Sequence, residues 1–133
     1  MGTEYGDSGK ERRMDLDSRD QTKSIAIDRE IIEQLREEGD NLLNELVEMF
    51  IGEAPRQMEA LALALGKGDA AAVRLAAHTL KGTAASFGAQ RMQTLAKAIE
   101  DKGRDGELDG ASATLAELRA ECERVREALE RLR

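Results

Sequence analysis

Aromatic residues are nearly missing from this 133-residue chain, which contains two Phe, one Tyr and no Trp. That shortage argues against stacking of bases on aromatic side chains, a common way to hold single-stranded nucleic acid. Basic residues are also in the minority, since 20 Lys and Arg stand against 27 Asp and Glu, for a net charge of −7. Duplex nucleic acid and anionic membrane surfaces both favour basic partners, so we expect the protein to bind neither.

Long apolar runs, cysteine and histidine are scarce as well. No apolar stretch approaches the roughly 20 residues of a membrane span, and the N-terminal sequence lacks the apolar core of a signal peptide. The single cysteine, Cys122, cannot form an internal disulfide. Together with the single histidine, His78, it cannot supply a zinc site with several such ligands. These absences predict a cytoplasmic protein in a reducing compartment.

What the chain does contain is typical of helical proteins. Ala, Leu, Glu and Arg are abundant and Pro55 is the only proline, a composition that favours an all-α fold. Residues 1–24 are polar and of mixed charge. They have too little apolar surface to offset the entropy lost on ordering, so we predict a flexible tail. The 133-residue chain is long enough for one domain with a hydrophobic core and too short for two, and we place this domain at residues 25–133.

Apolar residues recur at spacings of three and four in five segments after the tail. The predicted helices are a short one from Asp28 to about Glu37, a long one from Asp40 to the GKGD sequence at 66–69, a third from about Asp69 to Phe87, a fourth from about Ala89 to Lys102, and a last one carrying Leu108 to Leu132. The predicted N-caps are Asp28, Asp40 and Asp69. Pro55 is predicted to kink or divide the long helix, and DKGRDGELDG at 101–110 to form a turn-rich break. Short connections predict an antiparallel four-helix bundle with a short additional N-terminal helix.

The third predicted helix has one apolar face and one unusual exposed face. At about 100° per residue, its core stripe contains Val73, Ala76, Ala77, Leu80, Ala84 and Phe87. His78 lies about 200° around the helix from Leu80 and should therefore face solvent. The residues within about 60° of His78 are small or cationic, namely Ala71, Arg74, Lys81, Gly82 and Ala85. The simplest interpretation is an incidental histidine on a solvated helix face.

Two neighbours of His78 favour a chemical role instead. Gly82 costs about 1 kcal/mol relative to Ala in a helix interior, although no turn is needed there. Lys81 lies one turn from the histidine, where its ammonium can meet an anion attached to the ring. A neutral imidazole has an unprotonated nitrogen that can attack a phosphoryl group, and small neighbours allow a second protein to close over the ring. These residues predict a phosphoryl acceptor.

The sequence AHTLKGTAASFG, residues 77–88, resembles the signature of the histidine-containing phosphotransfer (HPt) domain family. The residues that match the family pattern in place are His78, Leu80, Lys81, Gly82 and Gly88. The resemblance extends over about residues 28–132 and includes the mid-helix proline and the GD turn that precedes the third helix.

The resemblance implies a function. HPt domains pass a phosphoryl group between aspartates of receiver domains in two-component phosphorelays, so His78 is implied to be the phosphorylated residue and Lys81 to assist it. We assign partner docking to Arg74, Thr79, Gly82 and Ala85. The implied partners are response-regulator receiver domains and a hybrid sensor histidine kinase, and we expect a monomer.

The chain is expected to be a phosphoryl carrier and not an enzyme. HPt domains have no ATP site, and the GKGD sequence lacks the Gly-to-Lys-Ser/Thr spacing of a phosphate-binding loop. No cofactor is expected in the chain itself. The Mg²⁺ needed for transfer to an aspartate is expected in the receiver partner.

Glu100 is the predicted partner of the His78 ring. In HPt-like domains a side chain on the next helix, 22 positions after the histidine, commonly accepts a hydrogen bond from the ring. That position is Glu100 in this chain, and antiparallel helices joined near Gly88 place it at a height similar to that of His78. A carboxylate there would hold a protonated Nδ1 and leave Nε2 free to attack. The alternative is an exposed glutamate on a polar face.

Two other functions remain open at the level of sequence. One is a detached HPt domain of the chemotaxis-kinase type, phosphorylated in trans by an ATP-binding subunit, since TAASFG at 83–88 resembles that subclass. The other is a helical adaptor that binds its partners without phosphoryl chemistry. The intact His78 and Lys81 argue against the adaptor.

Overall fold

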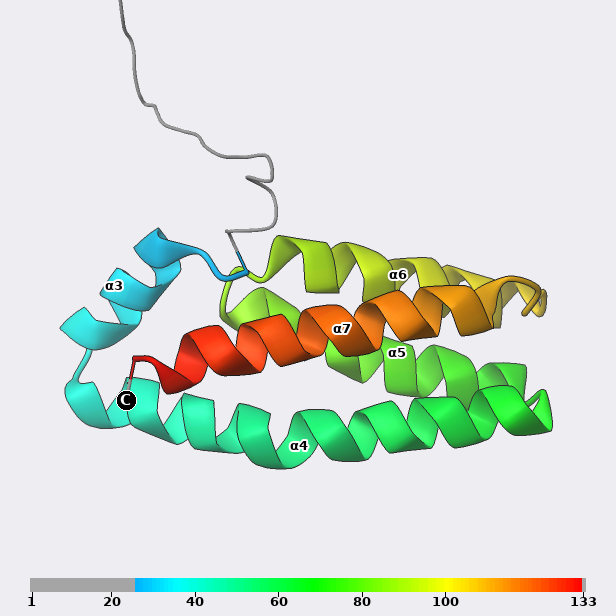
Figure 1. The fold of residues 1–133 in the computed structure, drawn as a ribbon, viewed down its shortest axis with the longest axis horizontal. Coiled ribbons are helices and arrows are strands. Elements are labelled where there is room, and N and C mark those ends of the chain that lie inside the picture. Colours follow the sequence, from blue (N-terminus) through cyan, green and yellow to red (C-terminus); the bar gives the residue numbers. More distant parts are fainter. Residues whose placement is uncertain (1–25, 133) are drawn as a thin grey trace, which may run out of the picture.

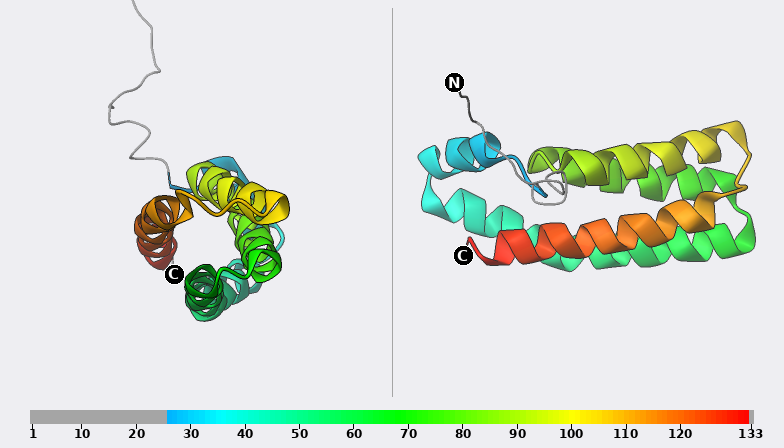
Figure 2. Two further views of the ribbon diagram at one scale, coloured as in Figure 1. Left: turned by 90° about the vertical axis from the view of Figure 1, so that its right-hand side faces the viewer. Right: turned by 45° about the horizontal axis from the view of Figure 1, so that its top comes forward.

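The computed structural model describes residues 26–132, so the predicted tail at residues 1–24 lies outside the described residues. The helices in this part of the chain are α3 (Arg29–Glu37), α4 (Asp40–Lys67), α5 (Ala70–Ser86), α6 (Gln90–Asp105) and α7 (Ala111–Glu130). Figure 1 shows α4 to α7 as long helices lying side by side, with the short α3 at one end. Seen end-on in Figure 2, the four long helices form a ring in which each contacts its two neighbours. The predicted all-α, antiparallel four-helix bundle with a short additional N-terminal helix is confirmed.

Two of the three predicted N-caps are confirmed. The side chains of Asp28 and Asp69 each accept a hydrogen bond from a backbone N–H of the first helical turn, at 2.8 and 3.1 Å. The third prediction is wrong, because Asp40 is the first residue of α4 and Gly39 occupies the cap position. Gly39 has a φ of 129°, a conformation open to glycine, so the sharp turn between α3 and α4 is made one residue earlier than predicted.

The helix α4 runs continuously through Pro55, so the predicted division of this helix does not occur. A proline inside a helix removes one backbone hydrogen bond and crowds the preceding turn. Ala54 and Met58, on either side of the proline, are both buried in the core. We attribute the continuity of α4 to this packing, which holds the helix against the core on both sides of the proline.

The helix α6 continues to Asp105, three residues beyond its predicted end, so the first half of the predicted break at 101–110 is helical. Gly103 is buried inside α6, and a Cβ added there would lie 2.7 Å from the backbone nitrogen of Arg74. The α5 backbone therefore approaches α6 closely at this glycine, which does not act as a helix breaker.

The turn between α6 and α7 lies later than predicted. Gly106 and Gly110 have φ values of 74° and 82°, which is the left-handed region that favours glycine. The last helix therefore begins at Ala111, and Leu108 packs against the core from the connecting segment.

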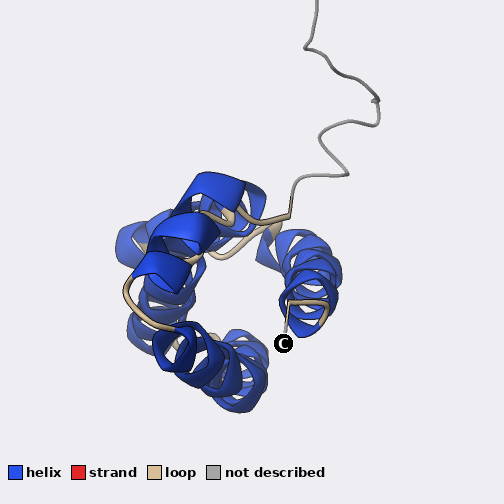
Figure 3. Ribbon diagram, turned by 90° about the vertical axis from the view of Figure 1, so that its left-hand side faces the viewer, coloured by secondary structure: helices blue, strands red, loops and turns tan. Residues whose placement is uncertain are grey.

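The short helix α3 is held against the turn between α5 and α6. The backbone N–H of Asp28 donates a hydrogen bond of 3.0 Å to the carbonyl oxygen of Phe87. Gly88 combines a φ of 64° with close contact, since an added Cβ would lie 2.2 Å from Cβ of Asp28. Figure 3 shows α3 at this end of the bundle, in front of the ring of long helices.

One hydrophobic core fills the bundle. Its largest fully buried side chains are Phe50, Phe87, Leu61, Leu80, Met92, Ile99, Leu118 and Leu129. The rings of Phe50 and Phe87 meet edge to face, with centroids 5.9 Å apart. None of the described helices is both long and apolar enough to cross a membrane. The core uses the inner faces of the helices and leaves the outer face of α5 and α6 free for a site.

Candidate functional site

The outer face of α5 presents His78 among small side chains, as predicted. The His78 side chain is 61% exposed. A Cβ added at Gly82, one turn along, would meet nothing within 4 Å, so packing inside this protein does not require glycine there. The hydroxyls of Thr79, Thr83 and Ser86 donate to the backbone carbonyls four residues before them. The side chains around the ring are therefore short, and the hydroxyls of this helix face already have hydrogen-bond partners.

Glu100 of α6 contacts the His78 ring, as the sequence predicts. Its Oε2 lies 2.7 Å from Nδ1 of His78. An ionised carboxylate can only accept a hydrogen bond, so Nδ1 carries a proton and its N–H donates the hydrogen bond to Oε2 of Glu100. In the neutral ring the lone pair is then on Nε2. Glu100 is only 7% exposed, so the alternative of a solvated glutamate on a polar face is wrong.

Lys81 binds the second oxygen of the same carboxylate. Its Nζ lies 2.8 Å from Oε1 of Glu100, and its side chain is 27% exposed. The Lys81 ammonium, opposed by burial and assisted by the hydrogen bond from His78, lowers the pKa of Glu100 below its ordinary value of 4.5. Glu100 is therefore ionised at neutral pH, and its carboxylate contacts both the His78 imidazole and the Lys81 ammonium.

The close packing of α5 against α6 explains how a glutamate reaches the ring. Gly103 lies one turn after Glu100 on α6, and Arg74 lies one turn before His78 on α5. Because an added Cβ on Gly103 would overlap the backbone of Arg74, the two helices are in close contact one turn from the site. Ile99, fully buried next to Glu100, fixes the rotation of α6 so that its neighbour points along the α5–α6 boundary. The sequence pattern does not identify Gly103, since glycine among charged residues indicates a turn.

A second charged group lies on the exposed side of α6. Asp101 accepts hydrogen bonds from Lys97 Nζ at 3.2 and 3.3 Å, and it also binds Arg104. These bonds, led by that from Lys97, lower the pKa of Asp101 below its ordinary value of 3.8. Sequence reasoning did not identify this group, although the spacing of three and four between opposite charges is the signal for it.

The structure joins three of the predicted site residues and leaves the others apart. His78, Lys81 and Glu100 form one contact set, whereas the docking residues assigned from the sequence lie along the exposed side of α5. Those docking residues are Arg74, Thr79, Gly82 and Ala85, and all four are exposed.

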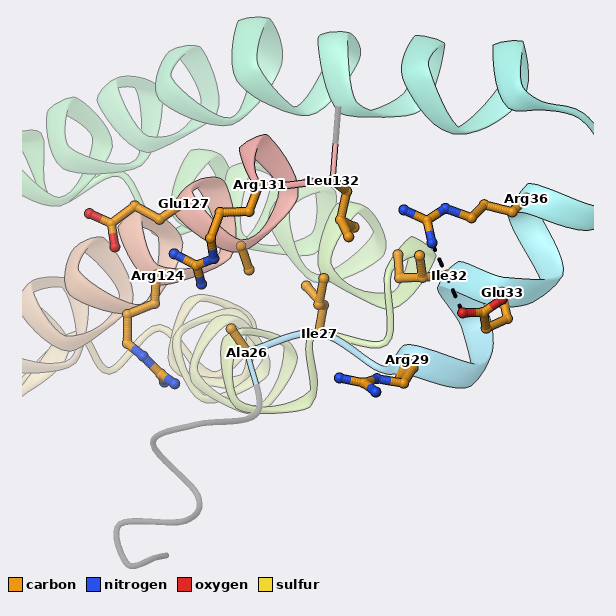
Figure 4. Close-up of a pocket in the computed structure, with 11 residues that line it drawn as sticks. Ala26, Ile27, Arg29, Ile32, Glu33, Arg36, Arg124, Glu127, Arg131 and Leu132 are labelled. Atoms are coloured by element: carbon orange, nitrogen blue, oxygen red, sulfur yellow. Dashed lines mark ion pairs between the residues drawn. The ribbon is translucent and has the colours of Figure 1, made fainter. Parts of the chain in front are cut away.

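A groove at the α3 end of the bundle is a different kind of surface. Its volume is about 650 Å³. Figure 4 shows the residues that line it, from α3 and the end of α7. Apolar side chains such as Ile27, Ile32 and Leu132 are interspersed with charges of both signs, and Arg36 pairs with Glu33 at 4.0 Å. No site residue predicted from the sequence lines this groove, so the His78 face is the candidate site.

Metal and thiol chemistry find no support in the described residues. Residues 26–132 contain no group of three or more His, Cys, Asp or Glu side chains placed to hold a metal ion. Cys122 is buried on α7 as predicted, and burial raises the pKa of its thiol to about 11. A thiol with so high a pKa is not a reactive nucleophile at neutral pH.

Comparisons with known proteins agree with this geometry. The sequence model of the family described as Hpt domain matches residues 45–128 of the chain. Among solved structures, the chain is similar to histidine-containing phosphotransfer protein B (HptB) from Pseudomonas aeruginosa PAO1. That similarity has a TM-score of 0.77 and 28% sequence identity, and it covers 81% of this chain and 94% of that chain. No curated protein matches the sequence.

Proposed function

The chain belongs to the Hpt domain family of histidine phosphotransfer proteins, and we propose that it carries a phosphoryl group on His78 between receiver-domain aspartates in a two-component phosphorelay. One observation carries this proposal. The only histidine of the chain is well exposed while its Nδ1 is bound to a buried carboxylate. We accordingly propose that the chain is a phosphoryl carrier, with His78 as the residue that holds the phosphoryl group.

The arrangement of His78 and Glu100 supports attack through Nε2. The Nε2 lone pair forms a bond to phosphorus while the bond from phosphorus to the aspartyl oxygen of the receiver breaks, and that carboxylate leaves with the electron pair. The ring keeps its proton on Nδ1 and becomes a phosphorylated imidazolium. Glu100, 2.7 Å from Nδ1, offsets the new positive charge. The reverse sequence returns the phosphoryl group to a second receiver aspartate.

Lys81 is proposed to act on the phosphoryl oxygens. Its ammonium is partly exposed, one turn from His78, and is held by Glu100 rather than by a distant acid. A phosphoryl group on Nε2 brings negative charge near this ammonium. The attraction between the two lowers the energy of the phosphoryl group during transfer. We propose that Mg²⁺ is supplied by the receiver and that the chain works as a cytoplasmic monomer with receiver domains and a hybrid kinase.

Transfer from a phosphorylated receiver tests the proposal. Receiver domains are phosphorylated with ³²P-labelled acetyl phosphate, freed of reagent and mixed with the full chain. We expect acid-labile label on the wild-type chain and none on His78→Gln, with the same helical content by circular dichroism. Label that persists on His78→Gln contradicts the assignment of His78. A wild-type chain that binds a receiver but takes no label favours the adaptor function.

The docking role of Gly82 is tested by adding a side chain. Gly82→Gln should stabilise α5 by up to about 1 kcal/mol, because nothing lies within 4 Å of the added Cβ. The same side chain should slow transfer between the two proteins by blocking close approach. Gly66→Gln is the matched control, since Gly66 lies in α4 with equally open surroundings. Equal transfer rates for the two variants would remove Gly82 from the docking surface.

A further inference from the structure

Charge is distributed unequally among the helices of this acidic protein. Helices α5 and α6 together carry six Lys and Arg against three Asp and Glu, a net charge of +3. Helices α3, α4 and α7 together carry seven against thirteen, a net charge of −6. The two helices that form the His78 site are therefore the positive side of a negative bundle.

The positive charges of α6 lie on the same side as Glu100. Lys97 precedes Glu100 by three residues and Arg104 follows it by four, spacings that place side chains on one helix face. Both are exposed, at 58% and 52% of the side chain. Arg74 lies four residues before His78 on α5 and is also exposed. Exposed cations therefore lie about one helical turn from Glu100 on α6 and from His78 on α5.

The chemistry of the proposed partner explains the use of such a surface. A receiver presents an aspartate as phosphoryl acceptor and holds Mg²⁺, a cation that proteins bind mainly through carboxylates. Its phosphorylation site is therefore acidic. An acidic site is repelled by a chain of net charge −7 in most orientations. It is attracted only where the local charge is positive, so the charge distribution favours encounters that present His78.

Asp101 opposes this attraction from within the same surface. It binds Lys97 at 3.2 Å and also binds Arg104, so one carboxylate restrains two cations and neutralises one unit of their charge. Neither cation is needed by the core, since both are exposed. The intrahelical bonds of Asp101 therefore compete with bonds from these cations to a partner.

We propose that Lys97, Arg104 and Arg74 form an electrostatic docking surface for the acidic phosphorylation site of the receiver, and that Asp101 limits its strength. This inference rests on the proposed phosphotransfer function and adds to it the residues that set the rate of encounter. Such surfaces act mainly on association rates and lose their effect at high salt.

Charge reversal at matched positions tests the docking surface. The second-order rate constant of transfer from a labelled receiver is measured at 20 mM and 500 mM NaCl. We expect Arg104→Glu and Lys97→Glu each to lower it about tenfold at low salt and by less than about twofold at high salt. Asp101→Asn should raise it about two- to threefold at low salt. Arg119→Glu, on α7 with 46% exposure, makes the same change in net charge and should have little effect.

The endpoint of labelling separates this inference from the proposed function. Each variant should reach the same final level of acid-labile label on His78, because the chemical groups are unchanged. If Arg104→Glu and Arg119→Glu lower the rate constant equally, or if the losses persist at 500 mM NaCl, the docking surface is wrong while phosphotransfer stands. If the wild-type chain takes no label, the proposed function fails. Thermal unfolding checks that the variants fold, and Asp101→Asn tests the surface by a gain that misfolding cannot produce.

Discussion

The bundle contains two buried glutamates, Glu100 on α6 and Glu121 on α7, which are 7% and 3% exposed. Both meet cations, as buried carboxylates must. Glu121 accepts two hydrogen bonds from Arg124 of its own helix, at 2.8 and 3.1 Å, and lies 3.6 Å from Arg91 of α6. Glu100 instead holds two groups of α5, His78 and Lys81, at 2.7 and 2.8 Å.

The difference between the two lies in their partners, not in their burial. A guanidinium keeps its charge and forms no covalent bond in this setting, so the charge of the groups that bind Glu121 does not change. The imidazole of His78 can gain a phosphoryl group and a positive charge while its Nδ1 stays bound to Glu100. A buried acid is therefore a functional candidate when the side chain that binds it can change its charge or covalent state. It is a structural residue when that side chain cannot.

Removing each carboxylate should separate the two roles most clearly. Glu100→Ala should slow phosphoryl transfer to His78 by roughly 10- to 100-fold, the equivalent of one hydrogen bond to a charged group. Glu121→Ala should leave the transfer rate unchanged and should lower the free energy of unfolding by about 1 kcal/mol. Rates come from labelled receiver and stabilities from urea unfolding. A slow Glu121→Ala variant, or a Glu100→Ala variant of wild-type rate, would contradict the comparison.

A change that pushes α5 away from α6 should weaken the contacts of Glu100 with His78 and Lys81. It should leave the contacts of Glu121 with Arg124 intact. Gly103→Ala adds a Cβ 2.7 Å from the backbone nitrogen of Arg74, so overpacking should lower stability by about 1–3 kcal/mol. Transfer to His78 should also slow, because the helix that carries Glu100 is pushed outward. Gly82→Ala is the control with open space around the added atom, and it should be neutral or slightly stabilising. Equal unfolding midpoints for the two variants would show that Gly103 does not set the spacing.

The cations that meet the two glutamates offer a matched pair. Lys81 and Arg124 are 27% and 31% exposed, and each binds a buried carboxylate. Lys81→Ala should slow transfer several-fold, because a partly exposed charge contact contributes about 1 kcal/mol. Arg124→Ala should not alter the transfer rate. Single-turnover transfer at saturating receiver measures this without a contribution from docking. Slowing of both variants by the same factor would assign the effect to general destabilisation.

Acidification should reveal the ion pairs of Glu100 as a small loss of stability. The pKa of Glu100 is lowered in the folded chain, so the unfolded chain binds its proton at a higher pH than the folded chain does. The resulting stabilisation is present above the ordinary value of 4.5 and is lost as pH falls through and below it. Glu100→Gln should lack this part of the acid sensitivity. Urea unfolding of both proteins at pH 7 and pH 3.5 measures it, and parallel losses would contradict the prediction.

Much of the fold follows from local sequence patterns. The spacing of apolar residues predicts four long helices and identifies which side of α5 is exposed, so the position of His78 could be predicted. Asp28 and Asp69 could be identified as caps because capping needs only neighbouring residues. The prediction of Asp40 as a cap is wrong, because the turn before α4 is made at Gly39 and depends on how α3 is held at the end of the bundle. Continuity of α4 through Pro55 likewise depends on packing partners from other helices.

The sequence by itself determined which residues face outward and that the chain has one histidine. It also placed Glu100, on the next helix, at the same position along the bundle axis as His78. Only the tertiary structure decided that Lys81 shares that carboxylate and that Glu100 is buried. The physical reason is that helix periodicity is a local property, while the distance between two helices depends on contacts such as that of Gly103 with Arg74. A 2.7 Å hydrogen bond between His78 and Glu100 needs that distance, which no single helix encodes.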